Sequence, residues 1–341
     1  MKRILKGLLG GIALLIVVYL LGPRVDRPDL GKTLPEVTSD LVALEAGIVA
    51  EEKATPNIRP DNHARIIWAD SVPTKTPYSI VYLHGWSASQ EEGDPLHQET
   101  ARRYGCNLYL PRLAGHGLQE DDPMSDLTAD QVIASAKEAI AVAKQLGEKV
   151  IVMATSTGGT LALHLSGGDP DIAALLLYSP NVAIFDPSAT LLAKPWGLQM
   201  AKWVTGSEYH EFDTDIDLKN QYWTTRYRLK ALTHLQAMVD ETMLPETFEA
   251  VKQPVFLGYF YKNDSIQDNV VSVPAMLTMF DELGTPTNLK EKVAFPEAGD
   301  HVMTSYITSK DLEGVTKETN EFLETVLKLT PALPSVAPVL K

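Results

Sequence analysis

The stretch VIVMATSTGGTLALHL, Val150–Leu165, places a serine directly between an apolar run and a helix-like segment. The apolar run up to Ala154 predicts a strand that is covered on both faces of a sheet. Ser156 stands at the turn, and a helix is expected over 157–166. A tight turn directs the serine side chain out of the sheet, and the first amides of the helix lie close to it. This arrangement suits a nucleophile whose attack creates an oxyanion.

The spacing of small residues around Ser156 supports this interpretation. Ala154 and Gly158 stand two residues before and two residues after the serine. The pattern is G-x-S-x-G with alanine in place of the first glycine. Small side chains at both positions allow the strand and the helix to approach each other closely.

Strands and helices alternate on both sides of this stretch, which predicts βαβ units and a mainly parallel sheet. A helix begins at Thr128, where Gln131 completes a capping box. The alternation stops between 181 and 251, where three of the five tryptophans lie in a segment of helical character. Strands are expected over 63–70, 78–86, 106–113, 149–155, 172–180, 254–261 and 290–295, and further helices over 39–53, 95–104, 270–283 and 312–327.

Several short motifs follow in order along the chain: LHGW, PRLAGHG, ATSTGG, KND and GDH. On these motifs the sequence resembles the α/β-hydrolase family over about 63–327, particularly its monoacylglycerol-lipase-like and carboxylesterase-like members. The resemblance implies an α/β-hydrolase fold, with a mainly parallel central sheet, helices on both faces and a helical cap insertion.

The resemblance also implies a Ser-His-Asp triad. Ser156 would be the nucleophile, and His301, in AGDHVM, would be the base that accepts its proton. A carboxylate fixes the tautomer of such a histidine and stabilises the imidazolium. Asp264, just beyond the strand PVFLGYFY, is the preferred acid. Asp268, four residues further on, is the rival, and Asp300 is interpreted as a loop residue.

The oxyanion hole implied by the resemblance consists of the backbone amides of Trp86 and Thr157. Trp86 is also expected to line the acyl pocket. The cap carries Trp196, Trp203 and Trp223, which are expected to bind substrate in an apolar tunnel. A cap also needs a core of its own, so these aromatic residues have an equally good structural explanation.

The expected function is therefore that of a serine hydrolase that cleaves carboxylic esters of acyl, lipid or monoglyceride type through an acyl-enzyme. Thioesterase, amidase and proline-type peptidase activities remain open on the same fold, as does a non-catalytic binding protein. No cofactor is expected. CxxC pairs and HExxH are absent from the sequence, so it predicts no metal site, and the single cysteine, Cys106, cannot form an internal disulfide.

The formal net charge of −14 argues against a nucleic-acid partner. Three basic residues precede an apolar run over 7–22, which predicts an N-terminal membrane anchor over 1–24 with the catalytic domain outside the cytoplasm. A cleaved signal segment, with a secreted or periplasmic protein, is the alternative.

The remaining organisation is expected to be a stalk over 25–60, a hydrolase core over 61–180 and 252–329, a helical cap or lid over 181–251, and a flexible tail over 330–341. The oligomeric state does not follow from the sequence.

Overall fold

The computed structural model describes residues 2–332 except residue 213. A central sheet of seven strands has the order β1-β3-β2-β4-β5-β8-β11. β1 pairs antiparallel with β3, and all other neighbours in this sheet are parallel. The mainly parallel sheet that the sequence predicts is thus confirmed. Its strands are β1 (Arg65–Ile67), β2 (Thr76–Leu83), β3 (Asn107–Leu110), β4 (Gly147–Thr155), β5 (Ile172–Tyr178), β8 (Val255–Tyr259) and β11 (Lys290–Ala294).

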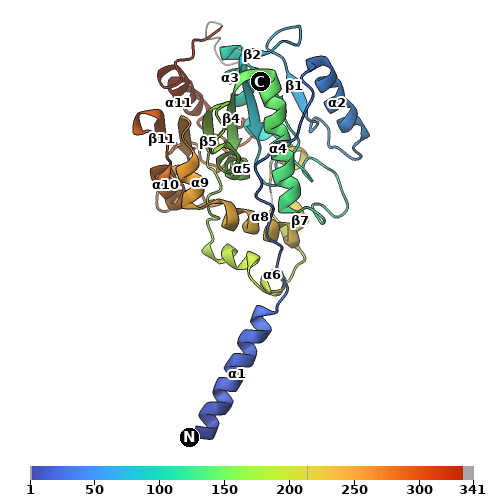
Figure 1. Ribbon diagram of the computed structural model, residues 1–341, viewed down its shortest axis with the longest axis vertical. Helices are drawn as coiled ribbons and strands as arrows, with labels where there is room; N and C mark the ends of the chain where they lie inside the picture. Colours follow the sequence, from blue (N-terminus) through green and yellow to red (C-terminus); the bar gives the residue numbers. More distant parts are fainter. Residues whose placement is uncertain (1, 213, 333–341) are drawn as a thin grey trace.

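Side chains of the central strands alternate between two apolar layers, as the pleat of a strand requires. On β2, Val81 and Leu83 belong to one buried cluster, and Ile80 and Tyr82 belong to the other. Helices cover both faces, and Figure 1 shows the strands enclosed between them. The first cluster includes residues of α4 (Ala129–Leu146), α5 (Thr157–Ser166), α8 (Leu229–Thr242) and α10 (Val273–Glu282), and the second includes residues of α3 (Leu96–Tyr104) and α11 (Leu312–Thr325).

The start of α4 follows the capping signal in the sequence. The side chain of Thr128 accepts a hydrogen bond from the amide of Gln131, and the Gln131 side chain accepts one from the amide of Thr128. The predicted capping box is therefore confirmed. Two of the amides that lack intrahelical partners are satisfied in this way.

The segment expected as a stalk contains α2 (Leu41–Ala54), which is packed onto the core. Leu44 belongs to the main apolar cluster. Glu52 is only 7% exposed, accepts a hydrogen bond from the amide of Ala64 at 2.8 Å, and pairs with Arg112 at 2.8 Å. The prediction of a linker over 25–60 is therefore corrected, because this buried ion pair joins α2 to the sheet domain.

At the N-terminus, α1 (Lys2–Leu20) forms a separate helix. Among the described residues, none of the helices has both the length and the apolar character needed to span a bilayer. This finding does not support the expected membrane anchor over 1–24. At the other end of the chain, the part of the expected flexible tail from 333 onward lies outside the described residues.

The insertion between β5 and β8 is largely helical, as expected. Figure 1 shows α6 and α8 between the sheet and α1. An antiparallel pair of short strands, which the sequence analysis did not predict, lies within it. The insertion contains the 3₁₀ helix η2 (Pro187–Ala193), α6 (Gly197–Thr205), β6 (Tyr209–Glu211), α7 (Asp217–Tyr222), β7 (Arg226–Arg228), α8 and α9 (Pro245–Ala250).

Candidate active site

Ser156 connects β4 directly to α5 in a strained turn. Its backbone has φ of 52° and ψ of −120°, a region that residues with a Cβ rarely adopt. Such a conformation costs about 1–3 kcal/mol and persists only where the surrounding structure enforces it. The residue is 7% exposed. The expected strand, turn and helix are all present at this position.

Close packing holds this turn in place. A Cβ built on Gly158 would lie 1.8 Å from the carbonyl oxygen of Leu83, so only glycine allows α5 to approach the end of β2. A Cβ on Gly85 would lie 3.0 Å from the Cβ of Ser156. The turn that follows β2, which contains Gly85 and Trp86, therefore lies against the serine.

His301 follows β11 and is bound to a buried carboxylate. Its Nδ1 lies 2.6 Å from Oδ2 of Asp268. Asp268 is fully buried, and its Oδ1 accepts hydrogen bonds from the amides of Val270 at 2.9 Å and Val271 at 3.0 Å. The carboxylate is thus held from both sides, and it fixes which ring nitrogen of His301 faces away from it.

Asp268 and His301 each favour the charged form of the other. Burial by itself would raise the pKa of Asp268, but the imidazole of His301 and the two amides lower it below its usual value. Burial would lower the pKa of His301, but Asp268, with Asp300 and Glu92, raises it above 6.5. The surrounding carboxylates thus favour the protonated form of His301, as a catalytic base requires.

Six other histidines have environments that oppose protonation, and in four of them the pKa is strongly lowered. Burial is the main cause in each case, because it disfavours the charged imidazolium. The pKa falls to about 3 for His84 and His97 and to about 4 for His116 and His164. These rings are poor candidates for the catalytic base.

Asp264, the preferred acid in the sequence analysis, does not contact His301. It lies at the exposed tip of the hairpin formed by β9 (Tyr261–Asn263) and β10 (Ile266–Gln267), and its Oδ1 accepts a hydrogen bond from the hydroxyl of Tyr261 at 2.8 Å. The hairpin returns the chain to β8, because the amide of Asp268 donates to the carbonyl of Phe260 at 3.0 Å. The contact with His301 that was expected of Asp264 is made instead by Asp268, the rival acid in the sequence.

The loop that carries His301 reaches the serine turn. Oγ1 of Thr155, the residue before Ser156, lies 3.4 Å from Oγ1 of Thr304. Nε2 of His301 is buried and has no hydrogen-bond partner among the described residues. A buried nitrogen without a partner costs free energy, and a catalytic role is one reason why a protein tolerates that cost. This atom is the one that a serine hydroxyl or a substrate would engage.

Two amides are candidates for an oxyanion hole. Thr157 is the first residue of α5, so no carbonyl of its own helix can accept its N–H. Trp86 follows Gly85 in the turn against Ser156, and its half-buried ring packs edge-on to His116 with 5.5 Å between ring centroids. The structure thus places both expected residues beside the serine.

The three cap tryptophans have different surroundings. Trp223 is 5% exposed and belongs to an apolar cluster with Ala88 and Val302, which flank the Trp86 turn and His301. Trp203 is 85% exposed. The indole nitrogen of Trp196 donates to the carbonyl of Val18 at 3.2 Å, on the side of the cap that faces α1. The expected tunnel lined by all three is corrected: only Trp223 packs beside the candidate site.

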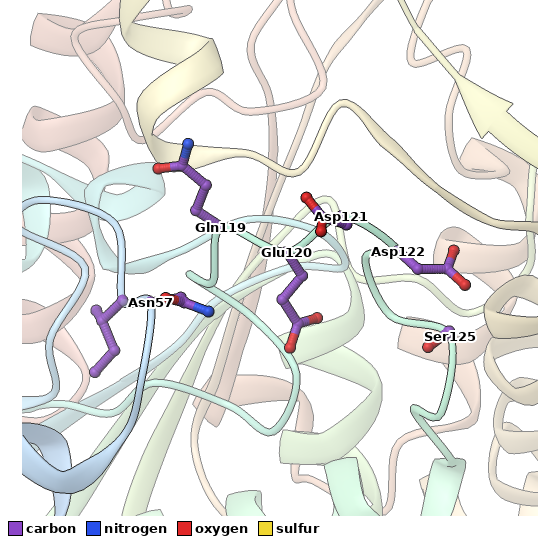
Figure 2. A pocket seen from close by; sticks show the side chains of 7 residues that line it. Asn57, Gln119, Glu120, Asp121, Asp122 and Ser125 are labelled. Atoms are coloured by element: carbon purple, nitrogen blue, oxygen red, sulfur yellow. The ribbon is translucent and has the colours of Figure 1, made fainter.

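A hollow of about 670 Å³ has none of these residues in its lining, and Figure 2 shows its lining side chains. Its walls are polar and acidic, and Asp122 in it is paired with Arg228 at 2.8 Å. In the described part of the chain, three or more His, Cys, Asp or Glu side chains are nowhere grouped so as to hold a metal ion. The lining residues are Asn57, Ile58, Gln119, Glu120, Asp121, Asp122 and Ser125.

Comparison with known proteins agrees with the fold. The model of the alpha/beta hydrolase family matches residues 80–307, which is more than half of the chain. A thermostable monoacylglycerol lipase of Bacillus sp. (strain H-257) is 33% identical over 108 residues, or 32% of this chain. The match spans 42% of that lipase's length.

Solved structures show the same fold at low sequence identity. One of the metagenome-derived lipolytic enzymes LipS and LipT has a TM-score of 0.62 and 18% identity, with coverage of 79% of this chain and 99% of its own. The monoacylglycerol lipase of Paleococcus ferrophilus has a TM-score of 0.54 and 15% identity, with coverage of 76% and 97%.

Proposed function

This chain belongs to the α/β-hydrolase family, and on that premise we propose that it is a serine hydrolase that cleaves carboxylic esters. The observation that carries the proposal is the buried hydrogen bond between His301 and Asp268 at 2.6 Å, beside the strained turn of Ser156. A fold alone does not determine an activity. The proposed activity therefore requires a nucleophile, a base with a raised pKa and a carboxylate on adjoining loops.

In the first half of the reaction, Nε2 of His301 accepts the proton of Ser156 while Oγ attacks the ester carbonyl. A bond forms between Oγ and the carbonyl carbon, and the carbonyl oxygen becomes an oxyanion that the amides of Trp86 and Thr157 stabilise. Asp268 holds the resulting imidazolium. The carbonyl then re-forms, the bond between the carbonyl carbon and the alkoxy oxygen breaks, and His301 gives the proton to the leaving alcohol, so that the acyl-enzyme remains.

In the second half, His301 removes a proton from water, and the hydroxide equivalent attacks the acyl carbon. The bond to Oγ breaks, Ser156 regains its proton from His301, and the carboxylic acid leaves. The reaction consumes an ester and a water and forms an alcohol and an acid, so it balances without a cofactor.

For the substrate we propose acyl esters of lipid type, including monoglycerides. The apolar cluster around Trp223, with Ala88 and Val302, borders the site and suits an acyl chain. The similarity to a monoacylglycerol lipase over 108 residues supports the same substrate class.

The test uses the full chain with p-nitrophenyl esters of increasing acyl length, a monoacylglycerol, and a fluorophosphonate probe. Wild-type protein should hydrolyse the esters and be labelled at Ser156. Ser156→Ala should lower turnover by at least about 10³-fold, while Ser125→Ala, a serine in the separate acidic hollow, should retain it. Folded wild-type protein that neither turns over esters nor reacts with the probe would instead be a non-catalytic binding protein.

A further inference from the structure

Glu92 is a buried carboxylate that lies in the loop after β2. It belongs to the 3₁₀ helix η1 (Gln90–Gly93) and is 2% exposed. Its Oε2 accepts a hydrogen bond from the amide of Gly85 at 2.6 Å. A charged acceptor makes such a bond shorter and stronger than a neutral one. Glu92 therefore clamps the turn that presents the amide of Trp86.

Further contacts fix the position of Glu92. Oη of Tyr82, on β2, lies 3.2 Å from its Oε2, and the hydroxyl of Thr304 donates to its backbone carbonyl at 2.7 Å. Thr304 comes three residues after His301. The backbone of Glu92 is thus anchored to the loop that carries His301, while its side chain is anchored to the turn that carries Trp86.

The carboxylate also lies close to the serine. A Cβ built on Gly85 would lie 2.7 Å from Oε1 of Glu92 and 3.0 Å from the Cβ of Ser156. Oε1 of Glu92 and the Cβ of Ser156 therefore both border the space in which Gly85 has no side chain. No motif in the sequence marks an acid at this position, because the pattern of the region is set by the HG pair and not by residues seven positions later.

We propose that Glu92 is a positioning residue, which fixes the Gly85–Trp86 turn against Ser156 and adds a further carboxylate to the surroundings of His301. The inference rests on the proposed function, which uses the amide of Trp86 and the imidazole of His301. Because Glu92 accepts its bond from Gly85 and not from Trp86, it leaves the Trp86 amide available to an oxyanion.

The titration of Glu92 adds support. Burial raises its pKa to about 7, against the lowering effects of the Gly85 amide, His301 and the hydroxyl of Tyr82. The negative charge of Asp300 also raises the pKa of Glu92. His301 in turn faces Asp268, Asp300 and Glu92, and each of these raises its pKa. An ionised Glu92 thus favours the imidazolium that forms during acyl transfer.

The experiment compares Glu92→Gln with Glu91→Gln in the full chain, by kcat, KM and the pH dependence of p-nitrophenyl ester hydrolysis. Glu91 is a matched control, because it is also buried in η1 but accepts its bond from the hydroxyl of Tyr306 at 2.9 Å. Glutamine at 92 can still accept from Gly85, without the charge. We expect Glu92→Gln to lower kcat about tenfold with little change in KM.

The pH profile separates positioning from a purely structural role. Removal of a negative charge beside His301 lowers the pKa of the imidazole, so the acid limb of kcat/KM should move to lower pH by about half a unit. Tyr82→Phe removes a donor that favours the ionised form of Glu92, and it should move the limb in the same direction by less. This second variant carries the test if Glu92→Gln does not fold.

Unchanged kcat and an unchanged acid limb in Glu92→Gln would overturn the inference, as would an equal loss in Glu91→Gln. If wild type and Ser156→Ala show the same negligible turnover, the proposed function itself fails, and the inference with it. A large difference between wild type and Ser156→Ala, together with an inert Glu92→Gln, would reject the inference alone.

Discussion

Asp264 and Asp268 lie four residues apart, at the tip and at the base of one hairpin, and their surroundings are opposite. Asp264 is exposed and bound to the hydroxyl of Tyr261, whereas Asp268 is fully buried between two amides and His301. The local sequence does not distinguish them, because both are aspartates in a short polar loop. What distinguishes them is the return of the chain, through the bond from the amide of Asp268 to Phe260, to the end of β8.

The strongest test of this comparison is Asp268→Asn. The asparagine side chain cannot stabilise the imidazolium, and its amide group can hold His301 in the wrong tautomer. We expect kcat for p-nitrophenyl esters to fall by about 10³–10⁴-fold, with a folded protein by circular dichroism.

Asp264→Asn is the matched control. Its carboxylate is exposed and its contact is with Tyr261, so kcat should stay within about twofold of wild type. A large loss in Asp264→Asn together with a mild one in Asp268→Asn would reverse the assignment.

The serine turn could be predicted from the sequence, and the position of the acid could not. Around Ser156 every requirement is local: the buried strand, Gly158 for the close approach to Leu83, and the helix that follows at once. The acid depends on a hairpin of two very short strands, β9 and β10, for which the sequence carries no clear alternation. The assignment of Glu52 to a stalk was wrong for a different reason, because its partner Arg112 lies 60 residues further along the chain and the contact leaves no local pattern.

The comparison of a buried with an exposed carboxylate can be repeated with Glu52. Its partner, Arg112, is distant in the sequence. Both side chains are about nine-tenths buried or more. Glu52→Ala leaves the guanidinium buried without its partner, which should lower the free energy of unfolding by about 3–5 kcal/mol. Chemical denaturation measures this loss.

Glu297→Ala is the control for that loss. Glu297 pairs with Lys262 at 2.9 Å, but both side chains are largely exposed. The expected change in the free energy of unfolding is below about 1 kcal/mol. Equal losses in the two variants would mean that α2 contributes no more than a surface ion pair does.

Gly158→Ala tests whether local packing alone holds the serine turn. The added Cβ would meet the carbonyl oxygen of Leu83 at 1.8 Å, and a backbone atom cannot move aside as a side chain can. We expect a loss of about 1–3 kcal/mol in stability, with a lower rate of fluorophosphonate labelling at Ser156. Gly47→Ala, in α2, meets no atom within 4 Å and should stabilise the protein by about 0.5–1 kcal/mol.

The smallest expected effect is a shift along the pH axis. Reaction requires neutral His301, so labelling of Ser156 falls as pH drops through the pKa of this imidazole, which lies above 6.5 in the folded protein. Asp268→Asn removes the anion that does most to raise this pKa, and the midpoint should move to lower pH by about one unit or more. Asp264→Asn leaves the midpoint in place.

Asp300 and Glu92, the other two carboxylates that raise the pKa of His301, are present in both variants, so the difference between the two profiles isolates the contribution of Asp268. The second-order rate of fluorophosphonate labelling, measured from pH 5 to 9, gives both profiles even where turnover is too slow to follow. Coincident midpoints in the two variants would mean that the buried contact between His301 and Asp268 does not control the charge of the base.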